Sequence, residues 1–147
     1  MGSRRRGSPN RLDRLLVRAR SRLARLGPRQ AATAVGGGAL IVDIRPEYQR
    51  RADGEIPGAI VIERNHLEWR LHPASAGRIP EAIDARVRWI VICDEGYASS
   101  LAAATLREIG LSAATDVVGG FQAWRAARLP IARRAKPMRP RLAPGRS

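Results

Sequence analysis

The sequence predicts an α/β fold, in which a central and mostly parallel sheet carries helices on both faces. Three observations support this prediction. Short apolar runs stop at polar residues, as strands buried on both faces do. Segments of helical composition alternate with these runs, which is the order expected of parallel strands joined by helical crossovers. The length of 147 residues suffices for one domain with a core of ordinary size.

A basic amphipathic helix is expected first, over residues 11–26. Arginines occupy one face, and apolar residues recur on the other at three- and four-residue intervals, at Leu12, Leu15, Leu16, Ala19, Leu23 and Leu26. Gly27 and Pro28 then end the helix. We expect the leucine stripe to pack on the domain that follows. A helix lying on a membrane surface and an organelle-targeting presequence are the second and third interpretations.

Four apolar runs are expected to form the strands of the sheet. In chain order they are ALIVDI (39–44), GAIVIE (58–63), RWIVIC (88–93) and TDVVGG (115–120). Helices are expected at PEYQRRAD (46–53), PEAIDARV (80–87), SSLAAATLREIG (99–110) and FQAWRAARLP (121–130). Ligands of such sheets bind beyond the carboxyl ends of the strands, and Cys93 occupies one of these ends.

The net charge of +14 is concentrated at the two ends of the chain. Residues 1–30 carry a formal charge of +9 and residues 131–147 carry +6, whereas residues 31–130 carry −1. Contact of these basic ends with nucleic acid or with an anionic surface is ranked below simple solvated extensions, because the compact part of the chain is nearly neutral.

The composition divides the chain into three parts. They are a basic arm with an amphipathic helix (1–29), a domain (30–131) and a basic tail (132–147). The tail is rich in proline and has no apolar period, so we expect it to be disordered.

Cys93 is the only cysteine in the chain, which excludes an intramolecular disulfide and a four-cysteine zinc site. His66 and His72 have no cysteine or carboxylate at a convincing ligand spacing, so we expect no metal site. No run approaches the roughly 20 apolar residues of a membrane span, and the arginine-rich start lacks the apolar centre of a secretory signal. These features predict a cytoplasmic protein without a transmembrane segment.

The residues after Cys93 are expected to favour a reactive thiol. A loop, DEGYA (94–98), leads into a helix whose N-cap is expected at Ser99 or Ser100. Backbone N–H groups of this loop and the positive end of the helix dipole then point toward the sulfur. Both stabilise a thiolate, which is the nucleophilic form of cysteine.

Four blocks of sequence resemble, in order, the rhodanese-like sulfurtransferase domains over about residues 30–131. The family's opening strand, which ends in Asp-x-Arg, is similar to LIVDIRPEYQ with its Asp43 and Arg45. A second block resembles GEIPGAIVI, although histidine is usual where this chain has Glu55. The active-site strand, cysteine loop and helix resemble WIVICDEGYASSLAAATLREIG, and the closing Gly-Gly turn and tryptophan helix resemble VVGGFQAWRAARLPI.

The resemblance implies a sheet of five mostly parallel strands and a reaction that carries sulfur as a cysteine persulfide. Cys93 would take the outer sulfur of a small-molecule or protein-borne donor and pass it to a thiol or cyanide, without a metal or an organic cofactor. Backbone N–H groups of the loop would stabilise the developing negative charge. The residues implied in substrate binding are Asp94, Glu95, Gly96, Tyr97, Ala98 and Ser99.

This loop departs from the family pattern in ways that bear on the donor. Many active members have an arginine where this chain has Ala98, and Asp94 and Glu95 add negative charge. Carboxylates near a thiolate oppose its ionisation and repel an anionic donor. We therefore expect thiosulfate to be a poor donor, and a protein-borne persulfide or a small neutral or cationic sulfur compound to fit better.

Other conspicuous residues are expected to be structural. Asp43 and Arg45 are expected to tie the first strand to neighbouring loops rather than to touch substrate. The tryptophans are expected to pack in the core or between elements, at Trp69, Trp89 and Trp124. Tyr97 either covers the sulfur or lies on the surface of the loop.

Three other functions compete with sulfur transfer. The cell-cycle dual-specificity phosphatases and arsenate reductases have similar folds, but their loop is one residue longer and ends in an arginine that grips phosphate, whereas Ser99 stands six residues after Cys93. A non-catalytic module would keep the fold and bind a protein partner. A thiol sensor would accept sulfur or an oxidant on Cys93 and report it through the ends of the chain. We favour sulfur transfer.

Overall fold

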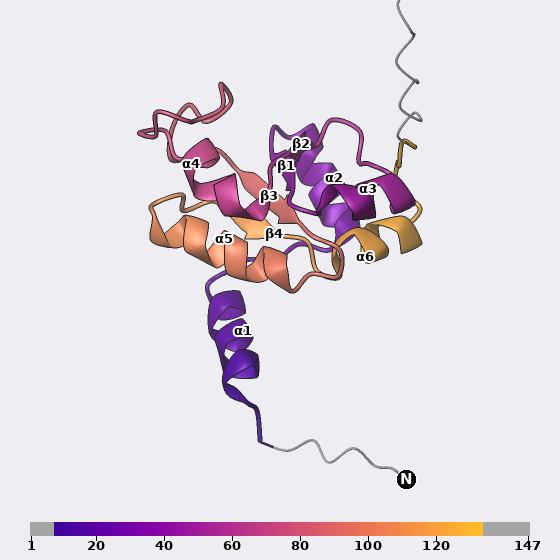
Figure 1. Cartoon of the computed structure of the whole chain (residues 1–147), viewed down its shortest axis with the longest axis horizontal. Coiled ribbons are helices and arrows are strands. Elements are labelled where there is room, and N and C mark those ends of the chain that lie inside the picture. Colours follow the sequence, from indigo (N-terminus) through magenta and orange to yellow (C-terminus); the bar gives the residue numbers. More distant parts are fainter. Residues whose placement is uncertain (1–7, 134–147) are drawn as a thin grey trace, which may run out of the picture.

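Four parallel strands form the central sheet of the computed structural model, which describes residues 8–133 (Figure 1). They are β1 (Leu40–Asp43), β2 (Ile60–Val61), β3 (Trp89–Ile92) and β4 (Thr115–Asp116), in the spatial order β2-β1-β3-β4. Each strand lies within the apolar run that predicted it. The α/β class and the parallel sheet are therefore confirmed.

The expectation of five strands is wrong for the described residues, because the position beside β4 holds a single pair. Leu26 donates its N–H to the carbonyl of Asp116 (3.0 Å) and accepts the N–H of Val118 (2.8 Å), which makes one parallel bridge. The pairing stops there because Gly27 is the N-cap of the next helix and Pro28 is its first residue.

Helices cover both faces of the sheet, as Figure 1 shows. One cluster of the core packs α4 (Leu67–Leu71) and α5 (Ala98–Glu108) on one face, and a second cluster packs α2 (Pro28–Gly36) and α6 (Gly120–Ala126) on the other. The helix α3 (Glu47–Asp53) follows β1, and a 3-10 turn, η1 (Arg64–His66), precedes α4. None of the helices in the described part of the chain is long and apolar enough to cross a membrane.

The helix expected over PEAIDARV (80–87) is wrong, since this segment forms turns. Asp84 accepts the N–H of Arg86 (2.8 Å) through its side chain, and this local bond competes with the helical pattern in so short a segment. Ala82 anchors the turns in the core. Two helices, α2 and α4, were not expected from the sequence.

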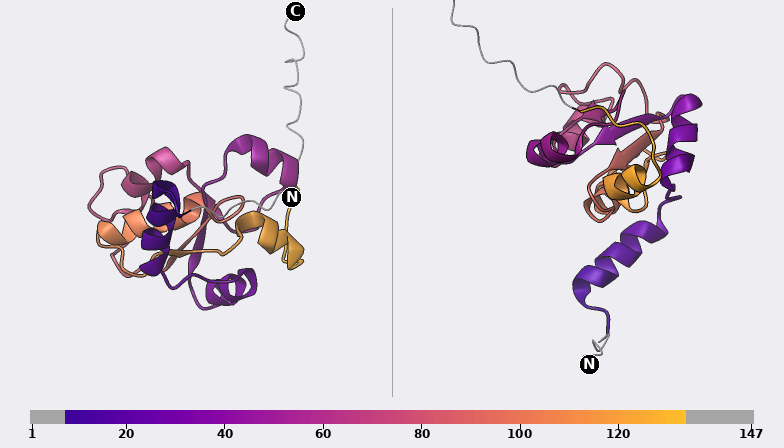
Figure 2. Two further views of the ribbon diagram at one scale, coloured as in Figure 1. Left: turned by 90° about the horizontal axis from the view of Figure 1, so that it is seen from below. Right: turned by 90° about the vertical axis from the view of Figure 1, so that its right-hand side faces the viewer.

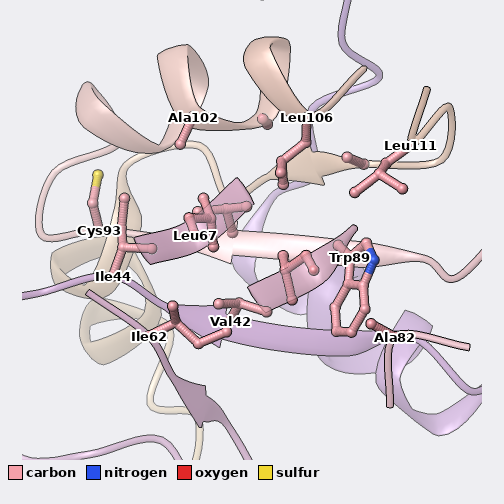
Figure 3. Close-up of a cluster of buried hydrophobic side chains, with 14 residues drawn as sticks. Val42, Ile44, Ile62, Leu67, Ala82, Trp89, Cys93, Ala102, Leu106 and Leu111 are labelled. Carbon is pink, nitrogen blue, oxygen red and sulfur yellow. The ribbon is translucent and has the colours of Figure 1, made fainter. Parts of the chain in front are cut away.

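The three tryptophans have different surroundings. Trp89 and Trp124 are buried, in opposite clusters of the core, as expected (Figure 3 for Trp89). The expectation is wrong for Trp69, whose residue surface is 64% exposed. In the five-residue helix α4 the buried positions are Leu67 and Leu71, one turn apart, so Trp69 between them faces solvent.

The arm forms the helix α1 (Arg11–Ser21), which projects from the domain in Figure 1 and in the right-hand view of Figure 2. Asn10 and Asp13 form a capping box at its start. The helix ends five residues earlier than expected, because the chain beyond it is held along β4, where the hydroxyl of Thr115 donates to the carbonyl of Ala24 (2.9 Å).

The expectation that the leucine stripe packs on the domain is met only by its second half, from Ala19 in α1 to Leu23 and Leu26 beyond the end of α1. Ala19 is buried there, and Leu23 packs against the core cluster that includes α5. Leu12 and Leu15, in the first half, are 61% and 45% exposed. The disorder expected of the tail (132–147) concerns residues that lie outside the described range except for the first two.

Candidate active site around Cys93

Cys93 follows the last residue of β3, at the carboxyl edge of the sheet where the sequence places it. Its sulfur accepts two backbone N–H groups, from Gly96 (3.2 Å) and Ser99 (3.3 Å). The residue is 7% exposed. In Figure 3 the sulfur lies beyond the labelled apolar side chains, on the side of the sheet that α5 covers. The loop therefore presents two backbone donors to the sulfur.

Two glycines shape the backbone at this point. Gly96 has φ +88° and Gly120 has φ +58°, both in the left-handed region that favours glycine. A Cβ on Gly96 would lie 2.8 Å from the nitrogen of Gly119, and one on Gly120 would lie 2.5 Å from the carbonyl oxygen of Cys93. Gly96 and Gly120 must therefore lack side chains so that the start of α6 can pack against the cysteine loop.

The start of α6 also holds the backbone that follows β3. The carbonyl of Cys93 accepts the N–H of Phe121 (2.8 Å), and the carbonyl of Asp94 accepts the N–H of Gln122 (3.1 Å). These bonds fix the backbone of the cysteine and of the first loop residue. The loop is thus anchored at its beginning by α6 and at its end by α5.

The two serines at the start of α5 do not cap it, contrary to expectation. The helix begins at Ala98, with Tyr97 at the N-cap and no side-chain cap, so the loop is one residue shorter than predicted. Ser99 instead donates its hydroxyl to the buried carboxylate of Asp116 (2.7 Å), and Ser100 donates to the carbonyl of Tyr97 (2.7 Å). A buried carboxylate needs donors, and this need outweighs capping here.

The acidic residues of the loop differ in their surroundings. Asp94 accepts the side-chain amide of Gln122 (2.8 Å) and is half-buried, whereas Glu95 is exposed. Tyr97 is exposed on the surface of the loop, with the guanidinium of Arg20 5.3 Å from the centre of its ring. Ala98 is exposed as well. Of the two roles considered for Tyr97, the structure shows the surface one.

The residues that sequence reasoning missed come from outside the loop. Arg20 and Arg25 both donate to the carbonyl of Gly96, and Arg25 also forms an ion pair with Asp116 (2.8 Å). The arm contains many arginines of similar surroundings in sequence, so nothing singled these two out. The one available signal was Asp116, a carboxylate inside the apolar run TDVVGG.

Asp43 and Arg45 have the structural role expected of them. The guanidinium of Arg45 donates to both carboxylate oxygens of Asp43 and to the carbonyl of Gly54 (2.9 Å), and it lies 3.8 Å from the centre of the Phe121 ring. Both charged residues are buried. They connect β1 to the loop after α3 and to α6.

His66 ends η1, and His72 follows the last residue of α4. His72 uses Nδ1 to accept the N–H of Ala74 (3.1 Å), in the turn after α4. Within residues 8–133, no three side chains of His, Cys, Asp or Glu lie close enough together to hold a metal ion.

The sequence profile of the rhodanese-like domain matches residues 28–127. The chain belongs to the rhodanese-like domain family. The thiosulfate sulfurtransferase GlpE of Pseudomonas entomophila (strain L48) is 34% identical to it over 105 residues, which are 71% of this chain and 87% of that protein. GlpE of Ectopseudomonas mendocina (strain ymp) is 35% identical over 106 residues, or 72% of this chain and 88% of that protein.

A solved structure from Rhodopseudomonas palustris CGA009 also resembles this rhodanese-like protein. It is a protein of unknown function described as a "possible tyrosine phosphatase", with a TM-score of 0.75, 30% identity, and coverage of 85% of this chain and 96% of that one. The polysulfide-sulfur transferase of Wolinella succinogenes has the same fold, with a TM-score of 0.65, 22% identity, and coverage of 84% of this chain and 88% of that one. In the present chain Ser99 occupies the position where a phosphatase loop requires an arginine.

Proposed function

We propose that this rhodanese-like protein is a sulfurtransferase that carries sulfur on Cys93. The thiolate attacks the outer sulfur of a donor R–S–SH, a sulfur–sulfur bond forms on Cys93, and the bond within the donor breaks to release R–SH. The product is the anion Cys93–S–S⁻. A thiol or cyanide then attacks the outer sulfur and takes it, which returns Cys93 as a thiolate.

The observation that carries this proposal is the convergence of the Gly96 and Ser99 N–H groups on one sulfur. Fixed backbone donors stabilise an anion without reorganising during the reaction. The first turn of α5, an eleven-residue helix, adds the positive end of its dipole on the same side. Because the chain has a single cysteine, the acceptor thiol belongs to another molecule.

Thiosulfate is proposed to be a poor donor compared with a neutral or protein-borne persulfide. The exposed carboxylate of Glu95 and the half-buried carboxylate of Asp94 stand in the loop that a donor must approach. Thiosulfate carries two negative charges, so both carboxylates repel it. Cytoplasmic thiols, which that compartment keeps reduced, are the proposed acceptors, and the cytoplasm is the proposed place of action.

Intact-mass spectrometry of the full chain tests the proposal. The reduced protein and a Cys93→Ser variant are incubated separately with thiosulfate, with a 3-mercapto-2-oxo acid and with cysteine persulfide, and cyanide is added afterwards. We expect a gain of one sulfur atom on the wild type alone, fastest with cysteine persulfide, and removal of that sulfur by cyanide as thiocyanate. A gain that persists in Cys93→Ser would place the sulfur elsewhere.

Failure of every donor to load Cys93 would overturn sulfur transfer. It would favour the non-catalytic module that binds a protein partner. Modification of Cys93 that alters the binding of a partner would instead indicate a thiol sensor. Equal loading by thiosulfate and cysteine persulfide would overturn the donor preference while leaving the sulfur carrier in place.

A further inference from the structure

One carbonyl in the sulfur loop is held by residues from far away in the sequence. The carbonyl of Gly96 accepts Nη2 of Arg20 (3.1 Å) and Nη2 of Arg25 (2.9 Å), while the N–H of the same glycine donates to the sulfur of Cys93. Both arginines precede residues 28–127, the range that the rhodanese-like profile matches. The arm therefore reaches the loop at the residue that contacts the sulfur.

A second set of bonds runs from the arm to the other donor on the sulfur. Arg25 pairs with both oxygens of the Asp116 carboxylate (2.8 and 3.0 Å). Asp116 is fully buried and accepts the hydroxyl of Ser99, whose N–H is the second donor to Cys93. Each of the two N–H groups on the sulfur is thus connected to an arginine of the arm through one residue or two.

The arm is held so that these arginines stay in place. Leu26 is bridged to Val117 beside β4, which fixes the backbone next to Arg25. Arg20, on the C-terminal half of α1, donates Nε to the hydroxyl of Ser100 (3.2 Å) and lies beside the ring of Tyr97. Within the described residues Arg20 pairs with no carboxylate, so its charge is directed at the loop alone.

We propose that Arg20 and Arg25 are positioning residues for the chemistry of Cys93. A glycine carbonyl in a thiolate loop carries partial negative charge, and two guanidinium groups offset that charge. They also hold Gly96 in its left-handed conformation, and glycine loses more conformational entropy on being fixed than any other residue. Sulfur transfer in this protein then depends on a segment that the family profile does not include. This inference rests on the proposed function of Cys93.

The charged groups in or bonded to the loop are Asp94, Glu95, Arg20, Arg25 and Asp116. Replacing Arg25 would leave the buried carboxylate of Asp116 without its cation, and this carries a risk of unfolding. Arg20 has no such partner, so Arg20→Gln is the sharper test. Arg22→Gln is its matched control, because Arg22 is exposed, lies two residues along and makes no side-chain hydrogen bond within residues 8–133.

The experiment measures the rate of Cys93 alkylation by iodoacetamide against pH, in the full chain. This rate reports the thiolate whether or not the protein transfers sulfur, so failure of the inference is distinguished from failure of the proposed function. We expect Arg20→Gln to slow alkylation at pH 7 by about threefold to tenfold, because Gly96 and its N–H donor to the sulfur are then held less firmly. Arg20→Lys should restore part of the rate, and Arg22→Gln should match the wild type.

An unchanged profile in Arg20→Gln, with a melting temperature equal to that of Arg22→Gln, would overturn the inference. Equal slowing in Arg20→Gln and Arg22→Gln would overturn it too, since that would indicate the general charge of the arm. If Arg20→Gln does not fold, the alkylation profile of Arg20→Lys is compared with that of the wild type instead. We expect the two profiles to differ, because an ammonium group lacks the planar fork that reaches both Gly96 and Ser100. An identical profile in that variant would also contradict the positioning role.

Discussion

The two central strands end level with one another, yet the loops that follow them use their polar groups in opposite ways. Asp43 of β1 pairs in register with Ile92 of β3. After β1, Asp43 is satisfied by Arg45, two residues on, and the pair is buried with both oxygens of the carboxylate occupied. This loop completes its own ion pair, and only Nη1 of Arg45 has no hydrogen-bond partner within the described residues.

The loop after β3 presents backbone donors to the sulfur of Cys93, and the cations that support this loop come from the arm. The sulfur of Cys93 has two N–H groups, and the arginines that support them lie 71 and 76 positions from Gly96 in sequence. A local pair gives rigidity at one strand end. A long-range set of bonds around a thiol that accepts two backbone N–H groups gives the candidate site at the other. The comparison teaches that burial of polar groups alone does not indicate a site, whereas a nucleophile that accepts oriented backbone donors does.

The largest effect is expected from breaking the closed pair after β1. Arg45→Met would leave the carboxylate of Asp43 buried without its cation, and we expect a loss of about 3–5 kcal/mol in the free energy of unfolding. Urea denaturation measures this loss. Arg51→Met is the control, because the ion pair of Arg51 with Glu47 is exposed and contributes little. Equal losses in the two variants would show that the buried pair does not stabilise the fold.

The next effect tests the contact between the Gly-Gly turn and the cysteine loop. Gly120→Ala would place a Cβ 2.5 Å from the carbonyl oxygen of Cys93 at φ +58°, and we expect a loss of about 2–4 kcal/mol from overpacking and backbone strain together. Gly58→Ala, at φ +78° with no atom within 4 Å, bears the backbone cost alone. Urea denaturation that ranks the two variants equally would contradict a tight contact at Gly120.

The strands and the position of the cysteine could be predicted because each corresponds to a pattern of neighbouring residues in the sequence. Central strands buried on both faces appear as continuous apolar runs, as in RWIVIC (88–93). A cysteine at the end of such a run, followed by Gly96 and a helix, must lie at the carboxyl edge of the sheet, next to the start of that helix. The prediction of a helix over 80–87 was wrong because apolar and charged residues alternate in turns as readily as in short helices. Packing against the rest of the domain determines which of the two forms.

The contacts of the arm could not be predicted, because they are tertiary. Arg20 and Arg25 are two of ten arginines among residues 1–30, and which of them reach the loop depends on where β4 fixes Leu26. The capping role expected of Ser99 failed for the same reason. Asp116, distant in sequence, competes for its hydroxyl. Pairings between residues so far apart in sequence are set by the fold and produce no local pattern in the sequence.

A smaller effect is expected from cutting the bond between Ser99 and Asp116. Ser99→Ala removes one donor from a buried carboxylate that keeps its pair with Arg25, so we expect a loss of about 1–2 kcal/mol in the free energy of unfolding. Ser112→Ala is the control, since Ser112 is exposed and its hydroxyl makes no hydrogen bond within the described part of the chain. Denaturation curves that coincide for the two variants would remove Ser99 from the set of bonds that supports the loop.

The smallest effect is expected from removing a negative charge from the loop after β3, which should weaken the repulsion of an anionic donor. Glu95→Gln removes an exposed carboxylate from the sulfur loop, and the rate of sulfur loading from thiosulfate should rise about threefold while loading from cysteine persulfide stays unchanged. Glu81→Gln makes the same change in net charge on the segment that leads into the opposite end of β3. Intact-mass time courses give both rates. Because exposed charges are screened by salt, the gain should shrink as ionic strength rises, and a gain that is independent of salt would assign the effect to loop geometry rather than to repulsion.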